Sequence, residues 1–136
     1  MEKLPRILLV DDDDTTNFLN ERLFHKLGVS DQVRIAHSGE EALALFTQPP
    51  PYEPTLLLLD INMPGMGGIE FLEAYLRLPQ AQQDATIIVV LTTSMDSSDL
   101  SRINELPIAG LATKPLNREK IDALLRLHFR RQLPEE

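Results

Sequence analysis

Residues 56–68 have the sequence LLLLDINMPGMGG. Four consecutive leucines are typical of a strand that is buried on both faces, as in a parallel sheet. The run ends at a carboxylate, Asp60, and a loop rich in proline and glycine follows it. In open α/β sheets, ligands bind at the carboxyl ends of the strands, so Asp60 is a candidate functional residue. An aspartate in this place can also simply begin a turn. The rest of the sequence distinguishes between these two roles.

The remaining chain alternates between strand-like and helix-like patterns. Apolar or alternating runs predict four more strands, at residues 6–10, 32–36, 86–91 and 108–113. Apolar spacing and capping residues predict five helices, over residues 15–27, 38–46, 69–76, 96–106 and 117–129. This alternation predicts right-handed crossovers, and therefore a doubly wound α/β fold with a five-stranded parallel sheet. Its size suits the flavodoxin-like strand order 2-1-3-4-5.

The apolar stripes of the helices predict which side chains enter the core. The stripe of the first helix comprises Leu19, Leu23 and Leu27, broadened by Phe18 and Phe24. The stripe of the third helix comprises Ile69, Leu72 and Leu76, with Phe71 and Tyr75 beside it.

Length, charge and composition narrow the class of protein. A chain of 136 residues predicts a single domain, with a core over about residues 6–130 and no effector domain. The net charge of -8 argues against binding to nucleic acid or to anionic membranes. Without cysteine there are no disulfides and no thiolate metal sites. No apolar run is long enough to cross a membrane or to serve as an export signal, so we expect a cytoplasmic protein.

Polar side chains follow the strands that are neighbours in the predicted sheet. The first strand ends at Asp11 and Asp12, the third at Asp60, the fourth at Thr92 and the fifth at Lys114. Three carboxylates at one edge repel one another unless a cation lies among them, and hard oxygen ligands describe a Mg²⁺ site. A carboxylate can also attack phosphorus, provided that the incoming negative charge is neutralised. Mg²⁺, the lysine and the threonine hydroxyl would together supply that neutralisation.

Taken together, these motifs resemble the receiver domains of response regulators. The resemblance rests on LLVDD, LLLLDINMPGMGG, VVLTTS and ATKPL, each at the end of a predicted strand, and it covers residues 6 to about 130. It implies that Asp60 is the phospho-acceptor. It also implies that Asp12 binds Mg²⁺ directly, that Asp11 binds it mainly through water, and that Asn62 offers its backbone carbonyl to the metal. Asp13 lies outside the motif and, with the acid that follows it, is expected to cap or flank the first helix.

The same resemblance assigns roles near the last two strands. Thr92 would be the switch hydroxyl and Lys114 the phosphate-contacting lysine, followed by a cis peptide bond to Pro115. Receivers usually have an aromatic residue three positions before this lysine, where this chain has Leu111. We therefore expect that the protein does not signal through the rotamer of an aromatic side chain.

The resemblance further implies a signalling role and a set of partners. The protein would be a phospho-accepting response regulator of a two-component system or phosphorelay, and it would catalyse only its own phosphorylation and dephosphorylation. The phosphoryl donor would be a histidine on a sensor kinase or on a phosphotransfer protein. Output would pass to another protein through the face formed by residues 96–106, 108–113 and 117–129, or by onward phosphotransfer. Arg126, Arg130 and Arg131 are candidate contacts on this face, although solvated charges are the commoner role of such residues. The chain's three histidines, His25, His37 and His128, need no role in this chemistry.

Three other functions compete with this interpretation. A degenerate receiver could act as a scaffold without being phosphorylated. A phosphohydrolase of the haloacid-dehalogenase type also places an aspartate after an apolar strand, but it requires a second aspartate where this chain has Asn62. A flavodoxin-like cofactor binder needs a phosphate loop after its first strand, where the four acids at residues 11–14 would repel a phosphate.

Overall fold

The strands form one parallel sheet in the predicted order. The computed structural model describes residues 3–47, 52–61, 67–92 and 108–133. Its strands are β1 (Arg6–Val10), β2 (Val33–Ala36), β3 (Thr55–Asp60), β4 (Thr86–Thr92) and β5 (Gly110–Thr113). They are ordered β2-β1-β3-β4-β5 and every neighbouring pair is parallel. This confirms the predicted fold class and strand order, and it brings the carboxyl ends of all these strands to one edge.

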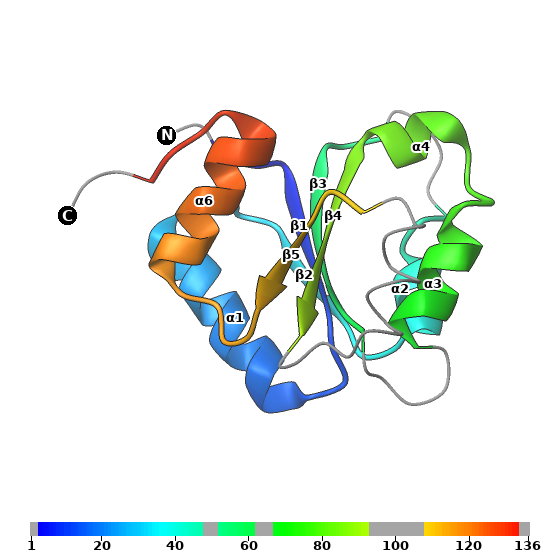
Figure 1. Ribbon diagram of the computed structural model, residues 1–136, viewed down its shortest axis with the longest axis horizontal. Coiled ribbons are helices and arrows are strands. Elements are labelled where there is room, and N and C mark those ends of the chain that lie inside the picture. Colours follow the sequence, from blue (N-terminus) through cyan, green and yellow to red (C-terminus); the bar gives the residue numbers. More distant parts are fainter. Residues whose placement is uncertain (1–2, 48–51, 62–66, 93–107, 134–136) are drawn as a thin grey trace.

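Helices cover both faces of the sheet. Those in the described residues are α1 (Asp14–Leu27), α2 (Gly39–Ala44), α3 (Gly68–Tyr75), α4 (Gln80–Asp84) and α6 (Arg118–Phe129). Figure 1 shows α1 and α6 on one face of the sheet, and α2 and α3 on the other. The helix predicted over residues 96–106 lies outside the described residues. Conversely, α4 was not predicted, because five residues are too few to show a helical period.

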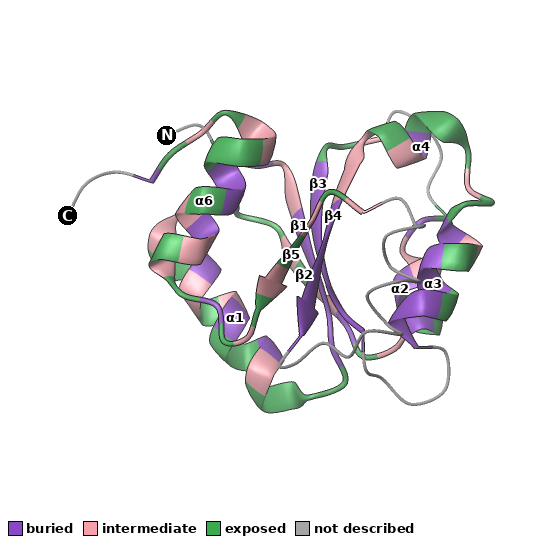
Figure 2. Ribbon diagram, viewed as in Figure 1, coloured by how far each residue is buried: buried purple, intermediate pink, exposed green. Residues whose placement is uncertain are grey.

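The sheet separates two apolar cores, and β3 contributes to both. All six residues of β3 are buried, as Figure 2 shows by the purple strand at the centre of the sheet. Leu57 and Leu59 pack with α2 and α3, whereas Leu56 and Leu58 pack with α1 and α6. Successive side chains of a strand point to opposite faces, so a run of leucines fills both cores at once. The run therefore has the role that its sequence predicts.

The predicted apolar stripes are partly wrong in α1 and α3. In α1 the buried residues are Asn17, Asn20 and Phe24, whereas Phe18 and Leu19 are 59% and 54% exposed. The first turns of α1 cover polar backbone at the end of β1 rather than the apolar core. Asn17 Nδ2, for example, donates a hydrogen bond of 2.8 Å to a backbone carbonyl there. Two amides are therefore buried beside β1, whereas Phe24 is buried as predicted and Leu23 and Leu27 pack against the core.

In α3 the predicted buried positions Ile69 and Leu72 are confirmed, but Leu76 is 47% exposed. The helix ends at Tyr75, so Leu76 follows the last helical residue and no longer lies on the buried stripe.

Gly68 is packed too closely for any side chain. Its N–H donates a 3.2 Å hydrogen bond to the carbonyl of Ile61. A Cβ atom at this glycine would lie 2.7 Å from Ile61 Cα and 2.9 Å from the carbonyl oxygen of Asp60. Glycine thus allows α3 to begin directly against the residue that ends β3. The close contact therefore involves the main chain of Asp60 and of the residue that follows it.

We expect Gly68→Ala to lower the free energy of unfolding by about 1–3 kcal/mol, because the added methyl group overpacks a backbone contact. Urea unfolding measures the loss. The matched control is Gly110→Ala, where the new Cβ would meet only His128 Nε2, at 3.5 Å. That control should not be destabilised. Equal stability of the two variants would show that the backbone around Asp60 yields to the methyl group.

Candidate functional site

Three acids meet where β1 and β3 end. Asp60 is the last residue of β3, and Asp11 and Asp12 follow β1, which is the neighbour of β3 in the sheet. Asp11 and Asp60 are each 5% exposed, whereas Asp12 is exposed to solvent. One carboxylate oxygen from each of the three lies within 4.8 Å of the others. The structure thus brings together three of the four residues that the sequence assigns to a metal; the fourth, Asn62, lies outside the described residues.

The donor set of this acid cluster, Asp11, Asp12 and Asp60, fits a hard divalent cation. Carboxylate oxygens are the ligands that Mg²⁺ and Ca²⁺ take in proteins, and Mg²⁺ usually keeps several waters as well. The exposure of Asp12 leaves one side of the cluster accessible to water. Without a cation, two buried carboxylates so close together would repel each other. Among the described residues, no other group of histidine, aspartate and glutamate side chains is placed to hold an ion.

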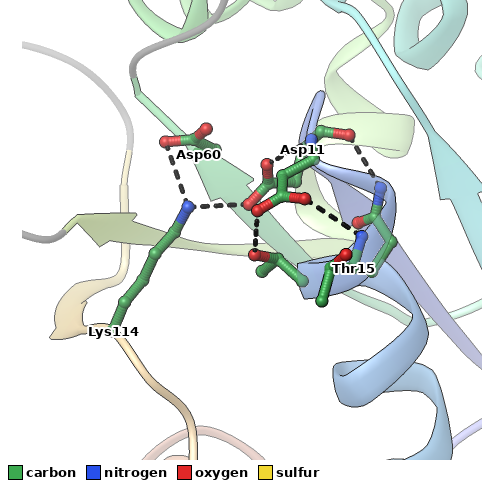
Figure 3. Close-up of polar contacts among 7 residues, drawn as sticks. Asp11, Thr15, Asp60 and Lys114 are labelled. Carbon is green, nitrogen blue, oxygen red and sulfur yellow. Dashed lines mark hydrogen bonds and ion pairs between the residues drawn. The ribbon is translucent and has the colours of Figure 1, made fainter.

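Lys114 supplies positive charge to the same cluster. Its Nζ lies 2.7 Å from Asp11 Oδ2 and 3.6 Å from Asp60 Oδ1. Figure 3 shows the Lys114 side chain pointing toward both carboxylates. Burial alone would lower the pKa of this ammonium, but the hydrogen bond to Asp11 and the charge of Asp60 outweigh burial and raise the pKa above its ordinary value. The lysine therefore stays protonated at neutral pH. The predicted cis peptide bond between Lys114 and Pro115 is confirmed.

Thr92 lies at the end of β4 with its side chain buried. It pairs with Thr113 of β5, and its carbonyl accepts a 2.8 Å hydrogen bond from the N–H of Lys114. In the neighbouring pair of strands, Asp60 is opposite Leu91, one residue before Thr92. The threonine and the lysine therefore belong to the same edge of the sheet as the acid cluster.

Asp11 is held in place by the start of α1. Its Oδ1 accepts a 2.9 Å hydrogen bond from the N–H of Asp13, and its carbonyl accepts a 2.8 Å hydrogen bond from Asn17 Nδ2. Asn17 is 2% exposed and is a site residue that sequence reasoning missed. Its only sequence signal is a polar side chain one helical turn beyond the N-cap. These contacts fix the main chain that carries the two acids after β1.

Asp13 caps α1 and takes no part in the acid cluster. Its carboxylate accepts hydrogen bonds of 2.8 Å from the hydroxyl of Thr16 and 3.0 Å from the N–H of Thr15. The Thr16 bond, followed by the Thr15 bond, lowers the pKa of the Asp13 carboxyl. The N-cap prediction for this acid is thereby confirmed. The next acid, Asp14, lies on the first turn of α1 and contacts His37 Nε2 at 2.9 Å.

The sequence matches a known protein family over most of its length. Residues 7–126 match the family described as response regulator receiver domain. A probable chemotaxis protein CheY from Rhizobium etli is 32% identical over 124 residues, which are 91% of this chain and 92% of that protein. Transcriptional regulatory protein CpxR from Klebsiella pneumoniae is 36% identical over 128 residues. The chain spans about half of the length of CpxR, 50%.

Solved structures agree with this assignment. A response regulator receiver protein from Dyadobacter fermentans superimposes with a TM-score of 0.80 at 30% identity, covering 89% of this chain and 94% of that chain. Chemotaxis protein CheY4 from Vibrio cholerae gives a TM-score of 0.76 at 28% identity, covering 91% of this chain and 98% of that chain.

None of the described helices has the length and hydropathy needed to span a membrane.

Proposed function

The chain belongs to the response regulator receiver domain family of two-component signalling, and from this we propose that it accepts a phosphoryl group on Asp60 and thereby controls its contacts with other proteins. Membership in the family implies interaction with histidine kinases or phosphotransfer proteins. The observation that carries the proposal is the buried carboxylate of Asp60 beside two further acids and the ammonium of Lys114. We also propose that the protein acts in the cytoplasm.

In the proposed reaction, an Oδ of Asp60 attacks the phosphorus of a partner's phosphohistidine. An O–P bond forms, the P–N bond breaks, and the histidine nitrogen keeps the electron pair. The incoming phosphoryl group adds negative charge to a site that already holds carboxylates. Lys114 Nζ is placed to neutralise part of that charge. Mg²⁺ bound by Asp11, Asp12 and Asp60 would neutralise the rest. In this proposal the protein catalyses only its own phosphorylation and dephosphorylation.

The direct test is the intact mass of the native chain after incubation with acetyl phosphate, with and without Mg²⁺. We expect an adduct of one phosphoryl group that forms only with Mg²⁺. Absence of an adduct would call for a binding measurement with beryllofluoride and Mg²⁺, because rapid hydrolysis can hide the phosphorylated form. Failure of beryllofluoride to bind as well would contradict the proposal and favour a scaffold that works without phosphorylation.

Mg²⁺ is expected to raise the melting temperature of the native chain, because a ligand that binds only the folded state stabilises it by mass action. The Asp12→Ala variant should lose most of this increase, since it loses a carboxylate that faces solvent in the acid cluster. Asp13→Ala is the matched control, because Asp13 caps α1 and lies outside the cluster. Thermal melts across a Mg²⁺ titration measure both variants. A full response in Asp12→Ala would contradict the metal assignment.

An apolar groove of about 480 Å³ lies between β5 and α6, the described elements of the face that was predicted to contact a downstream partner. It is lined by Leu111, Ala112, Thr113, Lys120, Ala123, Leu124 and Leu127. Leu127 is 75% exposed and Leu111 is 40% exposed, and exposed apolar side chains that share a groove are typical of contact surfaces. We propose that the downstream partner binds here. Leu111 then contributes apolar contact area in place of an aromatic switch.

A further inference from the structure

Lys114 reaches the acid cluster from a short loop between β5 and α6. The loop has to hold Lys114 Nζ between two carboxylates, at 2.7 Å from Asp11 and 3.6 Å from Asp60. On one side it is tied to β4 by the hydrogen bond from the N–H of Lys114 to the carbonyl of Thr92. A second lysine holds the other side.

Lys120 donates three hydrogen bonds to the residues on either side of Lys114. Its Nζ lies 2.9 Å from the carbonyl and 3.1 Å from the Oγ1 of Thr113, and 2.9 Å from the carbonyl of Pro115. An ammonium has three donors and no acceptor, so these contacts use its full capacity. The main chain of Lys120 is held as well, because its N–H donates a 2.8 Å hydrogen bond to Oδ1 of the N-cap residue Asn117.

Helix formation does not explain a lysine at this position. Lys120 is the third helical residue of α6, where an acid or glutamine is preferred and where the positive end of the helix dipole disfavours a cation. The neighbouring residue Glu119 follows the usual preference for an acid in the first turn. The contacts with Thr113 and Pro115 give the ammonium a favourable environment that the helix terminus does not.

We propose that Lys120 is a positioning residue of the phosphoryl-acceptor site, whose ammonium fixes the loop that presents Lys114 to Asp11 and Asp60. The proposal rests on the proposed function for its effect on phosphorylation. Its structural part, the coupling between the two lysines, stands on the contacts alone. The hydrogen bonds of the Lys120 ammonium go to Thr113 and Pro115 and not to the acid cluster.

The test compares Lys120→Met, which keeps the aliphatic stem but removes the ammonium, with Lys26→Met, which makes the same change at an exposed site on α1. With acetyl phosphate and saturating Mg²⁺, we expect Lys120→Met to slow formation of the adduct about tenfold, because small displacements of a charge-stabilising group are costly. The Mg²⁺ affinity should stay unchanged, since the metal ligands lie on other strands. Lys26→Met should react at the native rate.

A double-mutant cycle separates this proposal from the proposed function. If Lys120 holds the loop, Lys114→Met should change the unfolding equilibrium constant by a smaller factor in the Lys120→Met background than in the native chain. The two factors should differ about threefold. This measurement needs no phosphorylation, so it decides the coupling even if the native chain forms no adduct. Additive effects of the two substitutions would overturn the proposal. An unchanged rate of adduct formation in Lys120→Met, with a native chain that is phosphorylated, would overturn it too.

Discussion

Replacing Asp60 by asparagine is expected to abolish the Mg²⁺-dependent phosphoryl adduct while the fold is retained. The amide has nearly the shape of the carboxylate but is not a nucleophile towards phosphorus. Asp11 keeps its ion pair of 2.7 Å with Lys114, and the repulsion between the two buried carboxylates disappears. We therefore expect the metal-free variant to be as stable as the native chain or more stable. Intact mass and urea unfolding measure the two effects.

The control for Asp60→Asn is Asp31→Asn, which makes the same chemical change in an exposed ion pair with Lys3. It should form the adduct as the native chain does. An adduct of the same yield on Asp60→Asn would place the phosphoryl group on another residue. A large loss of stability in that variant would instead show that the carboxylate of Asp60 is required for folding.

Replacing Lys114 by methionine is expected to lower the free energy of unfolding of the metal-free protein by about 3–5 kcal/mol, because it leaves buried carboxylates without their cation. The side chains of Asp11 and Asp60 are only 6% and 7% exposed, and that of Lys114 is 17% exposed. Methionine keeps the length of the apolar stem, so the loss reports mainly on the charge. Mg²⁺ should restore part of the stability, since it replaces the missing positive charge.

Lys3→Met provides the comparison for this experiment. Lys3 Nζ lies 2.8 Å from Asp31 Oδ1, so this ion pair is close, but its side chains are 51% and 80% exposed. An exposed pair contributes less than about 1 kcal/mol, so this control should be nearly as stable as the native chain. Urea unfolding of both variants, with and without Mg²⁺, measures the difference. Equal losses would show that solvent screens the acid cluster far more than its burial indicates.

The sheet and the core of the site were predictable because the relevant signals are local. Asp60 follows an apolar run, as do the acids after β1 and the threonine at the end of β4. Parallel strands with helical crossovers have only a few possible orders, and these place the carboxyl ends together. The order of the elements is therefore enough to predict that Asp60 and Lys114 belong to one site.

Residues that hold the main chain around the site were harder to predict. Asn17 is buried because it binds a backbone carbonyl, and a search for apolar periodicity counts such a residue as exposed. Apolar periodicity likewise predicts that Leu19 is buried, whereas it is 54% exposed. Lys120 is recognisable only when its contacts with the loop of Lys114 are seen. A lysine in the first turn of a predicted helix was the one available signal.

The two ends of the described chain are both anchored in the core shared by α1 and α6. Leu4 and Leu133 are 2% and 3% exposed, and the N–H of Leu133 donates a 2.8 Å hydrogen bond to Oδ1 of Asp122. Figure 1 shows that β1 begins and α6 ends at the end of the sheet away from the strand arrowheads. A fluorescent reporter attached at either end would leave the acid cluster unobstructed. Such reporters could follow association with a kinase in real time.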